Sequence, residues 1–90
     1  MILGTARVED YDRFWQTFST EGAELRKKHG SKGAQVFHDP NDAGRVWAVF
    51  DWDEEGWQSY VADPQAAEVF KDAGLEAPPV NLEPAGETDG

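Results

Sequence analysis

A chain of 90 residues is enough for one domain, and its 18 acidic and 8 basic residues give a formal net charge of −10. A field of that sign repels phosphate backbones, which argues against nucleic acid as a partner. The sequence has no cysteine, so a disulfide framework, a thiolate nucleophile and a cysteine-based zinc site are excluded. No apolar run is long enough for a membrane span and none has the layout of a signal peptide, which predicts a soluble cytoplasmic protein.

The first elements expected along the chain are a strand over residues 2–8 and a helix that starts at residues 9–12. Acidic residues stand in the first turn of this helix and basic ones at residues 26–29, which complements the helix dipole at both ends. Gly30 then suits the left-handed conformation that ends a helix. Apolar residues at helical spacing form one stripe along it: Tyr11, Phe14, Trp15, Phe18, Gly22 and Leu25.

Two strands, over residues 33–38 and 45–52, are expected to form a hairpin through the turn-forming residues 39–44. A second helix begins at residues 53–55 and restarts at Asp63-Pro64, where Asp caps the new piece and Pro takes its first position.

A last strand over residues 80–83 is bracketed by prolines, which suits a sheet edge. The order predicts an α+β fold of the ferredoxin-like βαββαβ type with an antiparallel sheet. It occupies residues 1–84 as one domain, and residues 85–90 are expected to be a disordered tail.

The strand over residues 45–52 carries large apolar side chains on both of its faces. One face, with Val46, Ala48, Phe50 and Trp52, is expected to pack against the helices. The opposite face needs a second cover, and a second copy of the sheet is the simplest supply. The pattern therefore predicts a homodimer.

If His38 stands opposite Arg45, the uncovered face combines an apolar floor with a few polar groups, which is typical of a small-molecule pocket. A register shift of one residue would reverse the set that a strand contributes. The residues expected on this face are Thr5, Arg7, Ala34, Val36, His38, Trp47, Val49 and Asp51.

Each candidate site residue has two interpretations. His38 is either a general base, for which a near-neutral pKa suits it, or a polar residue at the mouth of the hairpin. Arg7 either holds a carboxylate or phenolate of a ligand or pairs with Asp51. Trp47 either stacks on an aromatic ligand or fills space between the sheets. His29 is expected to contact the terminal carbonyls of its helix.

No metal site is predicted. The acidic residues 51–55 are divided between strand faces or explained by helix capping, and residues 39–44 lack the distal glutamate of a calcium loop. The spacing supports neither a phosphate-binding loop nor a Ser/His/Asp arrangement.

Residues 8–13, 30–37, 50–53 and 63–64 with 72–74 follow one another in an order that resembles the dimeric α+β barrel superfamily of the antibiotic biosynthesis monooxygenases. Within it, the chain is most similar to a branch often labelled cyclase. The resemblance covers residues 2–82 and implies two facing sheets in a dimer, with a pocket between the sheet and the helices of each subunit.

Relatives in this superfamily include cofactor-free quinone-forming oxygenases, haem-degrading enzymes and muconolactone isomerase. Several of them carry a histidine in the second helix, whereas residues 56–60 here include none. This departure argues against haem ligation and against the commonest oxygenase arrangement.

Two functions remain. The first is a cofactor-independent monooxygenase, isomerase or cyclase-like enzyme that acts on a small aromatic or polyketide-like molecule, with His38 and Arg7 as its catalytic residues. The second is a non-catalytic, small-ligand-binding or stress-related dimer. A solvent-exposed His38 would weaken the first. The residues expected to line the ligand site are Thr5, Val36, Trp47, Val49 and Asp51.

Overall fold

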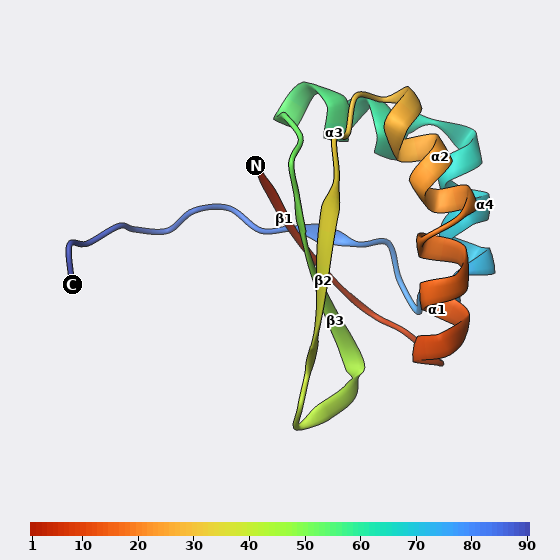
Figure 1. The fold of residues 1–90 in the computed structure, drawn as a ribbon, viewed down its shortest axis with the longest axis horizontal. Coiled ribbons are helices and arrows are strands. Elements are labelled where there is room, and N and C mark those ends of the chain that lie inside the picture. Colours follow the sequence, from red (N-terminus) through yellow and green to blue (C-terminus); the bar gives the residue numbers. More distant parts are fainter.

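The sheet carries all four helices on one face, and its other face is bare (Figure 1). The computed structural model describes residues 1–90. Its four antiparallel strands lie in the order β2-β3-β1-β4, which confirms the predicted βαββαβ arrangement with β4 at an edge. The elements are β1 (Ile2–Arg7), α1 (Tyr11–Phe18), α2 (Glu21–Lys28), β2 (Ala34–Asp39), β3 (Asp42–Phe50), α3 (Glu54–Ala62), α4 (Pro64–Asp72) and β4 (Val80–Asn81).

The first helical segment is two helices, where the sequence predicted one. The break falls at Ser19 and Thr20, whose hydroxyls donate to the carbonyls of Trp15, at 2.7 Å, and Gln16, at 2.6 Å. Side-chain bonds of this kind compete with the backbone ladder and bend helices. The bend lets α1 and α2 each lay a face on the curved sheet.

Aspartate caps three of the four helices. Asp10 accepts from the backbone N–H of Arg13, Asp53 from that of Gly56, and Asp63 from that of Gln65, at 2.6 to 3.0 Å. Each bond satisfies an amide that has no partner within its helix. The predicted restart at Asp63-Pro64 is therefore confirmed, with α4 beginning at the proline.

The hairpin is tighter than the sequence predicted, and its register differs. The strands extend to Asp39 and from Asp42, with a bulge beside His38. Because the connector is only two residues long, His38 stands opposite Val46 rather than Arg45. This one-residue difference moves every side chain of β2 to the other face.

The covered face of the sheet packs on the helices through a core rich in aromatic rings. Trp52 joins this core to the end of α2, because its indole N–H donates to the carbonyl of His29 at 2.9 Å. As predicted, alternate residues of β3 point to the helices. The main cluster consists of Ile2, Leu25, Ala48, Phe50, Trp52, Trp57, Tyr60, Ala66 and Val69.

The opposite face of the sheet is open and apolar, as the alternation in β3 predicted. Leu3, Phe37 and Val80 lie on it and are 39%, 47% and 55% exposed. Trp47 and Val49 are half-buried between them. We call this surface, made of these five residues, the open sheet face. None of the helices is long and apolar enough to cross a membrane.

Candidate functional site

A cavity of about 60 Å³ lies between the covered face of the sheet and the helices. Its walls are mainly aromatic and aliphatic, and Arg26 is the only charged residue that lines it. We call it the inner cavity. Its aromatic residues come from four elements and are Phe14, Phe18, Phe50, Trp57, Tyr60 and Phe70.

Arg26 lies in the last turn of α2 and is only 6% exposed. Its Nη2 donates to the carbonyl of Phe18 at 2.8 Å, and its guanidinium carbon lies 3.8 Å from the centroid of the Phe18 ring. The Phe50 ring centroid is 5.6 Å away. None of the ion pairs of the chain includes this arginine, so its charge is balanced by ring faces and a carbonyl rather than by an acid.

The neighbour of Arg26 in the inner cavity is Tyr60, which is 3% exposed. Burial lowers the pKa of Arg26, and the nearby Tyr60 opposes that shift. Burial also raises the pKa of the Tyr60 hydroxyl, while Arg26 pulls it downwards. Tyr60 therefore stays neutral near pH 7 and presents a hydrogen-bonding hydroxyl rather than a charge.

A groove of about 220 Å³ lies outside the inner cavity, between α1, α2 and the start of β2. It shares Phe18 and Arg26 with the cavity. Three of its ten lining residues are basic and none is acidic. We call it the outer groove. Its lining residues are Trp15, Phe18, Ser19, Ala23, Arg26, Lys27, Ser31, Lys32, Gly33 and Ala34.

Of the residues that the sequence predicted on the uncovered face, some lie there and others do not. Thr5, Trp47 and Val49 share that face, since Thr5 is paired with Trp47 in the register. The Thr5 hydroxyl is not free for a ligand, because it donates to the carbonyl of Val46 at 2.9 Å. Trp47 and Val49 therefore form a surface rather than an enclosed pocket in the single chain, whereas the buried Thr5 lines the inner cavity.

The expected pairing of Arg7 with Asp51 is wrong. Arg7 lies opposite Arg45 at one end of β3, whereas Asp51 follows Phe50 at the other end. Arg7 instead holds Asp42 through two hydrogen bonds, of 2.8 and 3.1 Å. This pairing raises the pKa of Arg7 and lowers that of Asp42, and both groups are well exposed.

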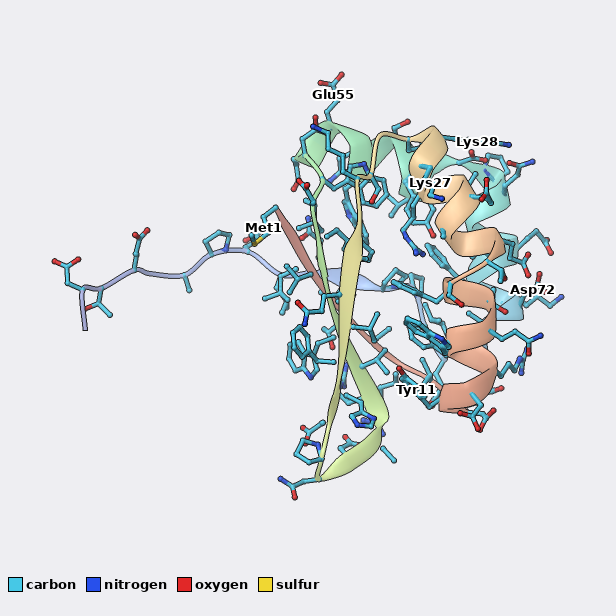
Figure 2. The ribbon with its side chains drawn as sticks, in the orientation of Figure 1. Met1, Tyr11, Lys27, Lys28, Glu55 and Asp72 are labelled. Atoms are coloured by element: carbon cyan, nitrogen blue, oxygen red, sulfur yellow. The ribbon has the colours of Figure 1, made fainter.

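The expected placement of His38 and Val36 is also wrong, because the register of β2 is shifted. Both residues point to the helix side, and Val36 packs against the core. His38 is exposed on the edge strand β2, 5.5 Å from the ring of Tyr11. Figure 2 shows Tyr11 at the start of α1. His38 and Arg7 therefore lie on opposite faces and do not form one site.

A Ser/His/Asp cluster is present, although the spacing along the sequence did not predict one. His29 Nδ1 lies 2.7 Å from Ser59 Oγ, and Nε2 lies 2.9 Å from Asp63 Oδ2. The ring thus contacts side chains of α3 and its boundary with α4, not the terminal carbonyls of α2. The cluster lines neither the inner cavity nor the outer groove, and we interpret it as a link between helices. No three His, Asp or Glu residues are grouped as metal ligands would be.

Arg26 is the other residue that sequence reasoning missed, although a signal was present. It follows Phe18 and Gly22 at intervals of four, so a cation stands within the apolar stripe of the helix. Gly22 makes room for it, because a Cβ there would lie 3.0 Å from Arg26 Nη1. The signal in the sequence was therefore a basic residue on the apolar face of a helix, four residues after a glycine.

No family model matches the sequence, and no curated protein is similar to it. Solved structures do match. SnoaB, a cofactor-independent oxygenase from Streptomyces nogalater, superposes with a TM-score of 0.69 and 11% identity over 99% of this chain and 95% of its own.

Two further structures cover a similar share. A protein assigned as an antibiotic biosynthesis monooxygenase from Deinococcus radiodurans has a TM-score of 0.62 and 18% identity, with 100% of this chain and 97% of that one covered. A NIPSNAP family protein of unknown function from Agrobacterium tumefaciens has a TM-score of 0.61 and 17% identity, covering 98% and 89%. The chain therefore has the fold of the antibiotic biosynthesis monooxygenase-like proteins, which the sequence predicted.

Proposed function

We propose that this protein is a homodimer in which each subunit binds a small aromatic or polyketide-like molecule in the inner cavity. We further propose that it acts on this molecule as a cofactor-independent monooxygenase or cyclase does. The observation that carries the proposal is the cavity itself, with aromatic walls, one buried cation and one neutral tyrosine. Ligand pockets combine apolar walls with a few placed polar groups in this way.

The inner cavity is small for this role. About 60 Å³ is well below the roughly 300–1,000 Å³ of ordinary ligand pockets. A ring system enters only if α1 and α2 move away from the sheet. The bend at Ser19 and Thr20 supplies a joint for this motion, since the helical ladder is already interrupted there.

The open sheet face supports the dimer. It exposes large apolar side chains, such as those of Phe37 and Val80, over several strands, and patches of this kind mark interaction sites. A second sheet packed on it would bury them at the usual sheet spacing of about 10 Å. Figure 1 shows no helix or further strand over this face, and the C-terminal segment extends away from the sheet on this side.

Catalysis has less support than binding. The catalytic roles predicted for His38 and Arg7 stay predictions, and no shared site supports them, because the two residues lie on opposite faces of the sheet. The exposed position of His38 favours the second function, ligand binding without turnover. The fold is compatible with both, because one fold hosts many activities.

Oxygen consumption and thermal stability together test the proposal. An anthrone, whose methylene group is oxidised by O₂ to a quinone carbonyl with release of water, serves as the probe. A rise in Tm shows binding, since a ligand of the native state stabilises it. Oxygen uptake above the rate without protein shows catalysis. A raised Tm without oxygen uptake would establish the binding function alone, and no change across hydroxylated anthrones and naphthoquinones would contradict the proposal.

A further inference from the structure

Arg26 places a positive charge in the inner cavity, and the packing of the aromatic walls alone does not require one. The residue is 6% exposed, and its guanidinium group, which carries five N–H donors, donates to the Phe18 carbonyl and lies beside the neutral Tyr60 hydroxyl. Taking a cation out of water without an anionic partner is unfavourable. A side chain held in this state is poised to gain free energy from any anion that reaches it.

The outer groove adds positive charge at the same place. Lys27 and Lys32 line it together with Arg26, so three of the eight basic residues of the chain surround one groove that none of its 18 acidic residues lines. Figure 2 shows Lys27 near the end of α2, where the chain passes towards β2. Its partner Glu24 lies 3.9 Å away and both side chains are largely exposed, which leaves that pairing weak.

A local positive field on an otherwise acidic protein concentrates anions at the groove and repels them elsewhere. Arg26 lines both the outer groove and the inner cavity. An anion drawn into the groove would therefore meet the buried guanidinium next.

The groove also offers aromatic surface. Trp15 is 46% exposed, and its ring lies 6.1 Å from that of Phe18 with the planes 22° apart. An aromatic ligand can stack on such a face, and offset arrangements of rings are favourable. Phe18 in turn lies under the guanidinium of Arg26. An aromatic ligand in the groove therefore has both ring surface and a positive charge within reach.

We infer that the ligand of this protein is an aromatic anion, a carboxylate or an ionised phenol, which enters through the outer groove and is held by Arg26 where the groove meets the inner cavity. The planar guanidinium matches two oxygen atoms of a carboxylate. Lys32 adds a second positive charge from the loop before β2. The inference rests on the proposed function and specifies the charge of its ligand.

Binding of naphthoic acid, ionised at pH 7, and of the uncharged naphthamide tests the inference by isothermal titration. The two ligands share their rings, so a difference in affinity reports on the anion. We expect the acid to bind roughly 10- to 100-fold more tightly, as one charged hydrogen bond would give. Arg26→Gln should remove the preference, and Lys32→Gln should weaken binding of the acid alone.

Lys71→Gln, on α4, is the matched control, because it changes the net charge equally but lines no part of the groove or the inner cavity. Circular dichroism checks that each variant is folded. If Arg26→Gln does not fold, Arg26→Lys and Lys32→Gln take its place in the test. Lysine keeps the positive charge of arginine but loses the paired N–H donors that match a carboxylate.

The outcomes separate the two proposals. The anion inference is overturned if the acid and the amide bind with equal affinity. It is also overturned if the preference for the acid survives in Arg26→Gln or is lost equally in Lys71→Gln. Each of these results leaves the proposed aromatic-ligand function standing. Failure of both ligands to bind overturns the anion inference, and it overturns the proposed function as well if anthrones and naphthoquinones also leave Tm unchanged.

Discussion

The imidazole Nε2 of His29 lies 2.9 Å from Oδ2 of Asp63 and connects the end of α2 to the junction of α3 and α4. The same ring contacts Ser59 of α3 through Nδ1. The hydrogen bond from His29 holds the pKa of Asp63 below its ordinary value, and the backbone N–H of Gln65 adds to the shift. One histidine therefore ties three helices, and the charge of Asp63 contributes to their stability.

The pH dependence of stability follows from this depressed pKa. A carboxyl whose pKa is lowered by folding stabilises the native state above its unfolded pKa, near 4, and loses that contribution as the pH falls through the folded value. We expect Asp63→Asn to lower Tm at about pH 5. The difference from wild type should shrink towards zero below about pH 3, as measured by circular dichroism.

Asparagine is the right replacement because it keeps the cap of α4, so the variant removes mainly the charge. His29→Gln should lower stability at about pH 5 in the same direction. A difference between wild type and Asp63→Asn that is constant from about pH 3 to pH 6 would show that the charge is not responsible.

Gly56→Ala is expected to destabilise the protein, although a glycine-to-alanine substitution within a helix usually stabilises it. Alanine in a helix is favoured over glycine by about 1 kcal/mol, but a Cβ at residue 56 would meet the Trp52 indole and lie 2.6 Å from the His29 carbonyl. Overpacking of this kind costs about 1–3 kcal/mol. We expect a net loss of stability in urea unfolding, whereas Gly86→Ala, with open space around it, should change nothing. A more stable Gly56→Ala would contradict the packing of Trp52 on α3.

Phe37→Asp tests the dimer through the open sheet face. Phe37 is 47% exposed in the single chain and, in a two-fold interface, would be changed in both copies. At about 2 kcal/mol for each copy, the dimer dissociation constant should rise roughly 1,000-fold. Sedimentation at micromolar concentration should then detect a folded monomer.

Val61→Asp is the control for that experiment, because Val61 is an exposed apolar residue on the helical layer instead, 39% exposed. It should leave the dimer intact. A wild-type protein that sediments as a folded monomer at micromolar concentration would refute the dimer altogether.

Arg26→Met should leave the stability of the ligand-free protein unchanged or raise it. A buried charge with no acidic partner has an uncompensated desolvation cost, which an apolar side chain of similar length removes. The same variant should lose affinity for an anionic ligand, which is the usual trade between stability and function. A strong loss of stability in urea unfolding would show that Arg26 serves the fold and not a ligand.

The order of the elements was predictable because it depends on local chemistry. Asp53 and Asp63 are caps wherever a helix starts after them, and the prolines near β4 restrict it to an edge. The two apolar faces of β3 were equally readable, since side chains alternate along any strand. From this alternation alone came the covered face, the open face and the prediction of a second copy.

The site depended on relationships that no local pattern contains. The register of β2 was set by a two-residue loop and a bulge beside His38, and a shift of one residue exchanged the predicted positions of His38 and Phe37 relative to the helices. The bend at Ser19 and Thr20 likewise turned one expected helix into two.

The sequence by itself therefore determined the element order, the caps and the two-faced sheet, because periodicity and turn chemistry act over a few residues. Only the tertiary structure decided that Arg26 lies buried without an acid and that His29 meets Asp63. Both facts depend on helices distant in the sequence being packed together on one face of the sheet, and the packing of distant segments follows from shape and burial rather than from spacing along the chain.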